Sequence, residues 1–144
     1  ASFAGILVLV AGYVSVAPTH NITALPLSLL AFLFLSYTLA LPIKDFKDIE
    51  GDRRDHVYTL PVLLGAERGK YVIGSLLFLL FALSPLVLAL RSLLIPALLF
   101  GSLAYFVLQK GTDDEHSFFA YRKLPRIVLG ITTLYGLVIV FFLI

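Results

Sequence analysis

The sequence "KDFKDIEGDRRDHVYTLPVLLG", residues 44–65, decides the fold, because it places acids and bases between two long apolar runs. Residues 25–43 precede it and residues 71–90 follow it, and Leu, Phe, Ile, Val and Ala dominate both runs. The hydrocarbon core of a bilayer is about 30 Å thick and needs roughly 20 apolar residues per helix. Each run is therefore long enough to cross a membrane, and the charged stretch is expected at a membrane surface.

The composition extends this interpretation to the whole chain. Of its 144 residues, 60% are hydrophobic and 14% are charged, whereas about 25% are charged in a typical soluble domain. A net charge of +2 without a basic tract argues against nucleic acid as a partner, and the lack of cysteine excludes disulfides. We predict an all-α fold, a multi-pass transmembrane helical bundle of about five helices that forms one domain, 1–144. The predicted spans are residues 3–17, 25–43, 71–90, 93–108 and 124–144.

The basic residues predict the orientation of these spans. Every Lys and Arg except Arg91 lies in or beside the connections that follow the second and fourth predicted spans. Lys and Arg concentrate in cytoplasmic loops of membrane proteins, so we expect both connections on the cytoplasmic side. All nine acids lie on that side too. Acids contribute little to orientation, and their position therefore needs another reason.

Four aspartates suggest a reason. If the second span continues as a helix past Lys44, then Asp45, Asp48, Asp52 and Asp55 fall on one helical stripe. Like charges at this spacing repel, and a divalent cation with hard oxygen ligands, Mg²⁺ or Ca²⁺, would compensate them. A calcium loop of the EF-hand type is excluded, because Arg53 and Thr59 stand where Gly and Glu are needed.

The interleaved bases leave two interpretations open. Carboxylates together with Lys and Arg at the mouth of a membrane pocket could hold a metal and a diphosphate. Alternatively, the stretch is a solvated juxtamembrane loop whose charges pair locally and bind anionic lipid. The residues that follow favour a short helix, with Pro61 in its first turn and Gly65 at its end. This helix would cover the aspartates or serve as a simple connector.

A longer ordered pattern carries a family resemblance. It consists of Lys44-Asp45-x-x-Asp48-x-Glu50-Gly51-Asp52, followed by Thr59-Leu60-Pro61-Val62 and Gly65. This pattern resembles the second aspartate-rich motif of the UbiA superfamily of intramembrane prenyltransferases. Within the superfamily it looks most similar to the branch of archaeal digeranylgeranylglyceryl phosphate synthase and chlorophyll synthase. The resemblance implies that the five spans are the C-terminal part of a nine-helix fold.

The sequence departs from the family pattern at two places. His56 stands where the family commonly has Gly, so the backbone differs there or His56 reaches toward the site. Such enzymes also carry a first motif, Asn-x-x-x-Asp-x-x-x-Asp, whereas the only Asn here is Asn21, with no Asp in register. We therefore expect the chain to hold half of an active site and to need the N-terminal half of the same protein for activity.

The resemblance implies a Mg²⁺-dependent enzyme that transfers a prenyl group from an isoprenyl diphosphate to a lipid-soluble or amphipathic acceptor within the membrane and releases diphosphate. Asp48 and Asp52 would bind the metal, with Asp45 as an additional ligand, and these three are the candidate catalytic residues. Lys44 and Arg53 would neutralise the diphosphate. Membrane lipid would surround the bundle.

Two weaker signals have structural alternatives. Tyr37 lies two helical turns before Lys44 and is a candidate for substrate binding, although an interfacial Tyr is the more common case. The acids of residues 112–116 would either cap the start of the next helical piece or contact the acceptor. For the chain as a whole, the competing functions are a fragment of a cation-binding transporter and a non-catalytic membrane subunit. Transporter ions, however, usually bind near the middle of the membrane.

Overall fold

The computed structural model describes residues 27–143, and the first predicted span, residues 3–17, lies outside the described residues. The described chain is helical, with no strand between residues 27 and 143. Its elements are α2 (Leu27–Ala40), η2 (Leu41–Asp48), α3 (Ile49–Arg54), α4 (Leu60–Leu64), α5 (Ala66–Val87), η3 (Arg91–Leu93), α6 (Leu94–Gln109) and α7 (Leu124–Leu143), where η marks a 3₁₀-helix.

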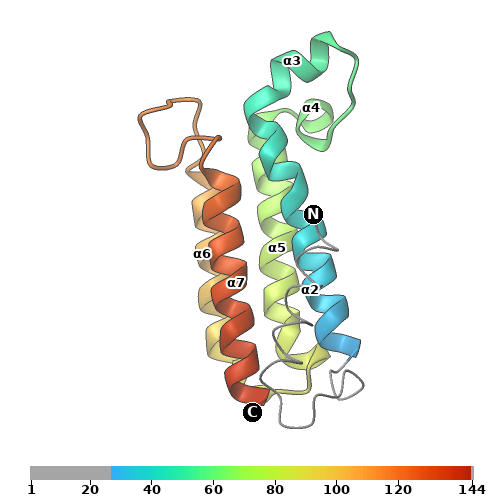
Figure 1. The fold of residues 1–144 in the computed structure, drawn as a ribbon, viewed down its shortest axis with the longest axis vertical. Helices are drawn as coiled ribbons and strands as arrows, with labels where there is room; N and C mark the ends of the chain where they lie inside the picture. The colour runs from blue at the N-terminus through green and yellow to red at the C-terminus, as the bar shows by residue number, and fades with distance from the viewer. Residues whose placement is uncertain (1–26, 144) are drawn as a thin grey trace, which may run out of the picture.

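Within residues 27–143, four helical segments are long and apolar enough to cross a membrane: Leu27–Arg54, Ala66–Val87, Arg91–Gln109 and Leu124–Phe142. In the bundle, α5 makes its most extensive contacts with α6, and α7 packs on both α6 and α2. At one end of the bundle, α3 and α4 lie on one side and the connection between α6 and α7 on the other (Figure 1). The predicted all-α transmembrane bundle is confirmed for this part of the chain.

An aromatic cluster forms the centre of the bundle. The Phe81 side chain is fully buried, and its ring meets Tyr135 edge-on at 4.9 Å and Phe32 at 6.0 Å between ring centroids. The Tyr135 hydroxyl also forms a hydrogen bond with the hydroxyl of Ser84, which joins α7 to α5. Close packing and interhelical hydrogen bonds are what hold helices together in lipid, where apolar burial alone gives no driving force.

The predicted helix beyond Lys44 exists, but its geometry differs from the prediction. Residues Leu41–Asp48 are 3₁₀ rather than α, with Pro42 in the first turn, and α3 ends at Arg54. Side chains three residues apart eclipse one another in a 3₁₀-helix, so Asp45 and Asp48 share one face. Asp55, however, is the C-cap of α3. The predicted stripe of four aspartates is therefore wrong at Asp55, because the helix ends before it.

His56 adopts a backbone conformation that is typical of glycine. Its φ is +55°, in the left-handed region, and the Val57 amide donates to the Asp52 carbonyl at 2.8 Å. A six-to-one bond of this kind around a left-handed residue is a Schellman C-cap, in which glycine is the usual residue. His56 is exposed at this position. His56 thus occupies, with local strain, a backbone conformation that glycine adopts freely.

We expect His56→Gly to stabilise the protein by about 0.5–1 kcal/mol. A non-glycine residue in the left-handed conformation costs about 1–2 kcal/mol, and the greater conformational entropy of glycine in the unfolded chain offsets part of the relief of that strain. Thermal unfolding in detergent measures the change. His56→Ala is the control, since it removes the imidazole and keeps the Cβ. Equal stabilisation by both substitutions would contradict the backbone explanation.

The short helix predicted around Pro61 is confirmed as α4. Pro61 lies in its first turn, and Gly65 ends it with φ +77°. α4 contacts η2, α3 and α5. The Thr59 hydroxyl, just before α4, donates to Asp52 Oδ2 at 3.5 Å. The segment therefore packs against the helices that carry the aspartates, and Thr59 contacts Asp52 directly.

Candidate functional site

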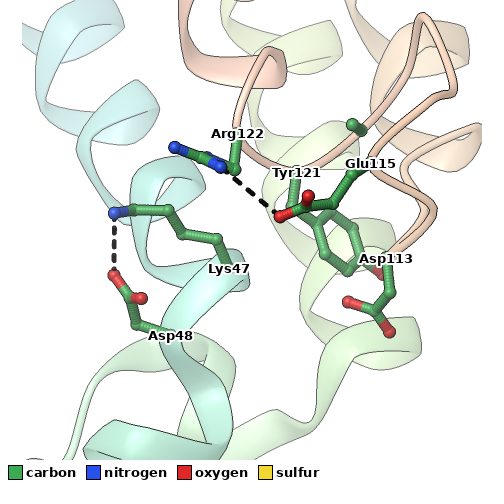
Figure 2. Close-up of a pocket in the computed structure, with 7 residues that line it drawn as sticks. Lys47, Asp48, Asp113, Glu115, Tyr121 and Arg122 are labelled. Carbon is green, nitrogen blue, oxygen red and sulfur yellow. Dashed lines mark hydrogen bonds and ion pairs between the residues drawn. The ribbon is translucent and has the colours of Figure 1, made fainter.

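A polar cavity of about 320 Å³ lies at the end of the bundle, between η2 and the loop 110–123 that joins α6 to α7. From η2 it is lined by Lys47 and Asp48. From the loop it is lined by Asp113, Glu115, Ala120, Tyr121 and Arg122. Figure 2 shows these two groups of side chains on opposite sides of the cavity. One wall thus comes from the aspartate motif and the other from a loop more than 60 residues later in the sequence.

Two ion pairs occupy the cavity. Lys47 Nζ lies 3.1 Å from Asp48 Oδ2, and Arg122 Nη1 lies 3.4 Å from Glu115 Oε1 (Figure 2). All four side chains are about half exposed or more. Exposed pairs of this kind contribute only about 0–1 kcal/mol. A metal ion or a phosphate group can therefore replace either pairing at little cost.

The other candidates from the motif lie outside the cavity lining. Asp45 is 3.5 Å from Lys44 Nζ and its side chain is 23% exposed, whereas the Lys44 side chain is 64% exposed. Asp52 is partly buried and accepts the Thr59 hydroxyl. Arg53, in the last turn of α3, is exposed. Of the three candidate catalytic aspartates, Asp48 alone faces the cavity.

Tyr37 lies in a different environment. It lines a small apolar pocket of about 70 Å³ between α2 and α7, together with Leu33, Thr132 and Gly136 among others. This pocket shares no residue with the polar cavity. Tyr37 is thus placed beside the membrane-spanning part of the bundle rather than beside the charged groups.

A preformed metal cage is absent from residues 27–143, since no three Asp, Glu or His side chains in this range gather closely enough to hold an ion. Mg²⁺, however, usually takes only one or two carboxylates and completes its shell with water and substrate phosphate oxygens. Asp48, which lines the cavity, has the hard oxygen donors that such a shared ion needs, whereas Asp52 lies outside the cavity lining. The donor chemistry of Asp48 fits a metal that is bound jointly with a phosphate ligand.

The loop 110–123 contributes Tyr121 and Arg122, which the sequence analysis did not assign to the site, and two acids that it considered as possible contacts with the acceptor. The idea that its acids cap a helix is wrong, because the next helix, α7, begins at Leu124. Asp114 instead accepts the backbone amide of His116 at 3.0 Å in a local turn. Its neighbours Asp113 and Glu115 line the cavity. The distribution of Lys and Arg predicts that this loop and the aspartate motif lie on the same side of the membrane, but it does not predict which of their residues meet.

Tyr121 joins the loop to the motif helix. It is buried, and its ring stacks on Phe46 of η2, with centroids 5.6 Å apart and planes at 24°. Burial raises the pKa of the Tyr121 phenol above its ordinary value of 10.0, and the nearby Lys70 cation partly opposes this. The phenol therefore stays neutral at physiological pH.

Comparison with known families decides the identity. The sequence profile of the UbiA prenyltransferase family matches residues 1–124. The chain belongs to the UbiA prenyltransferase family. No curated protein and no solved structure gives a significant match. The profile match is to the UbiA family as a whole and does not favour the digeranylgeranylglyceryl phosphate synthase and chlorophyll synthase branch. UbiA membership and the four apolar helices indicate an integral membrane protein with prenyltransferase activity.

Proposed function

We propose that the chain is part of a Mg²⁺-dependent enzyme that transfers a prenyl group from an isoprenyl diphosphate to a lipid-soluble or amphipathic acceptor. The observation that carries the proposal is the position of Asp48, on a motif that resembles the family's second aspartate motif and in a polar cavity at the end of an apolar bundle. A substrate with a charged head and an isoprenoid tail suits a polar cavity beside lipid.

Each motif residue receives a role in this proposal. Asp48 and Asp52 hold Mg²⁺ together with the diphosphate, and Asp45 is an additional ligand. Lys44 and Arg53, both exposed and on the same helical segment, neutralise diphosphate oxygens. Tyr37 contacts the substrate through the apolar pocket, where a prenyl chain would lie.

The reaction breaks the allylic C–O bond, and the bonding electrons leave with the diphosphate. The acceptor then forms a bond to the allylic carbon and loses a proton. Bound Mg²⁺ would supply charge stabilisation for the leaving diphosphate. The cations of the motif act on the same charge, and preorganised groups of this kind are usually the largest contribution to catalysis.

The proposed site needs a second set of carboxylates. The family's first motif, Asn-x-x-x-Asp-x-x-x-Asp, does not occur in the 144 residues. We infer that the N-terminal half of the same protein supplies it and that the two halves form one nine-helix domain. The loops that carry the charged residues lie on the cytoplasmic side in this proposal, in accord with their content of Lys and Arg.

Ligand-induced stabilisation tests the proposal. We expect a non-hydrolysable prenyl thiodiphosphate with Mg²⁺ to stabilise the full-length protein in detergent by about 2.7 kcal/mol at a hundredfold excess over Kd, measured as a rise in Tm. Mg²⁺ alone and the corresponding prenyl alcohol with Mg²⁺ are the controls, and neither should approach this shift. A full response to Mg²⁺ alone would favour a cation transporter. No response to the complete mixture would count against any diphosphate site.

A further inference from the structure

Lys70 is buried although it carries a charge. It lies in the second turn of α5 and is 4% exposed. Lysines near the end of a membrane helix normally extend their ammonium group to water, and a buried charge is costly unless it is paired and hydrogen-bonded. Lys70 instead turns into the protein, where its Nζ lies 2.8 Å from Glu67 Oε1. The chain therefore accepts a cost that an outward-pointing side chain would avoid.

Besides the ion pair with Glu67, whose own side chain is 85% exposed, compensation for this burial comes from the loop 110–123. Lys70 Nζ donates to the backbone carbonyl of Gly111 at 3.1 Å, across 41 residues of sequence. The same Nζ lies 6.0 Å from the centroid of the Tyr121 ring. Lys70 thus contacts both ends of the loop, and it joins that loop to the start of α5.

Gly111 allows this close approach. A Cβ added there would lie 2.7 Å from Leu124 Cδ1 and 2.9 Å from Tyr121 Cε1, distances that real Cβ atoms do not reach. Any larger residue at this position would therefore force Tyr121 or Leu124 to shift. Glycine at position 111 permits the close packing of the backbone whose carbonyl accepts the Lys70 hydrogen bond.

Fixing Gly111 also fixes the residues that line the cavity. Backbone hydrogen bonds join Thr112 N to Phe119 O at 3.1 Å and Tyr121 N to Thr112 O at 3.0 Å, which closes the loop on itself. Tyr121 stacks on Phe46 of η2, and Arg122 follows it into the cavity wall (Figure 2). The hydrogen bond from Lys70 to Gly111 therefore restrains the position of the cavity wall that faces Asp48.

We propose that Lys70 is a positioning residue for prenyl transfer, which holds the loop 110–123 against η2 and so sets the width of the cavity in which Asp48 meets the diphosphate. This inference rests on the proposed function. Lys70 itself does not line the cavity. It acts through Gly111 and Tyr121.

Lys70→Met in the full-length protein tests the role in the reaction. We expect the KM for the prenyl diphosphate to rise about tenfold while kcat changes less than about threefold, because a hydrogen bond from a charged donor is lost and the wall loosens without loss of a reacting group. Lys70→Arg retains the cation, and its KM should stay close to the wild-type value. A residue that only stabilises the fold would lower Tm and leave KM unchanged well below Tm, and that result would overturn the proposal.

Lys123→Met is the matched control. Lys123 Nζ also donates to a loop carbonyl, Ser117 O, at 3.0 Å, but from an exposed position and within the same loop. The substitution removes the same charge and the same kind of hydrogen bond without separating the loop from α5. Its KM should stay within about twofold of wild type. A rise equal to that of Lys70→Met would mean that net charge, and not the link to α5, is responsible.

Limited trypsin digestion gives a readout that does not depend on activity. Lys110 and Arg122 are exposed within or beside the loop, and cleavage there should be about tenfold faster in Lys70→Met than in wild type, followed by the masses of the fragments. Unchanged cleavage would overturn the proposal. If the wild-type protein transfers no prenyl group, the proposed function fails, and the digestion alone decides whether Lys70 holds the loop.

Discussion

Asp48→Asn in the full-length protein should lower kcat/KM for prenyl transfer at least about 100-fold. The substitution preserves the shape of the side chain and removes the negative charge that would hold Mg²⁺, and loss of one electrostatic group of this kind costs about 10²–10³ in rate. Asp52→Asn should have an effect of the same order. Initial rates with a labelled prenyl diphosphate measure both, and unchanged turnover in either variant would contradict the metal-ligand assignment.

The control for this experiment is Asp114→Asn. Asp114 is an exposed acid in the loop 110–123, and the cavity lining does not include it. Its Oδ1 accepts the His116 amide, a bond that Asn can also make. Wild-type activity in Asp114→Asn together with a large loss in Asp48→Asn would separate the specific role of Asp48 from a general effect of surface charge.

Phe81→Ala should destabilise the bundle by about 3 kcal/mol. A buried Phe reduced to Ala typically costs about 3–5 kcal/mol of stability. The lower end of this range applies here, because the separated helices expose the ring to lipid and not to water, so the cost comes mainly from lost packing contacts. The ring lies at the junction of α2, α5 and α7, against Phe32 and Tyr135. Unfolding in mixed detergent micelles measures the change.

Leu79→Ala is the comparison for Phe81→Ala. Leu79 lies two residues earlier on the same helix, is 52% exposed in the bundle and faces outward. Its truncation should cost less than about 1 kcal/mol, since it removes few protein contacts. Equal destabilisation by both substitutions would mean that the aromatic cluster is no more tightly packed than the outer surface.

Hydropathy predicts the membrane-crossing segments well and their ends poorly. The fourth predicted span, residues 93–108, agrees closely with α6. The third was placed at residues 71–90, whereas α5 begins at Ala66 and ends at Val87. Its first turn contains Glu67 and Arg68, which hydropathy assigns to a loop, although an acid in a first turn favours a helix through its dipole. Hydropathy therefore does not predict the polar helical turns that extend a span at the membrane surface.

For the candidate site, too, local sequence patterns predict one part and tertiary contacts decide the other. Local patterns predict Asp45, Asp48 and Asp52 as one group, because their spacing is a property of one segment, but only Asp48 of the three lines the cavity. The opposite wall of the cavity depends on contacts over long sequence separations, such as the one between Lys70 and Gly111. A Lys beside Glu and Arg has the appearance of a surface residue in the sequence. Its burial is decided by tertiary packing alone.

The 3₁₀ geometry of η2 has a consequence for the lipid bilayer. A 3₁₀ residue rises about 2.0 Å and an α residue about 1.5 Å, so the 14 residues of α2 and the 8 of η2 extend about 37 Å. An α-helix of the same 22 residues would extend about 33 Å, so the 3₁₀ geometry adds about 4 Å to a segment that already exceeds the hydrocarbon thickness of about 30 Å. Under the proposed function, the tail of the substrate lies in hydrocarbon and the bond that breaks lies at the boundary. Bilayer thickness then becomes a determinant of turnover, since acyl chains of different length move that boundary along η2.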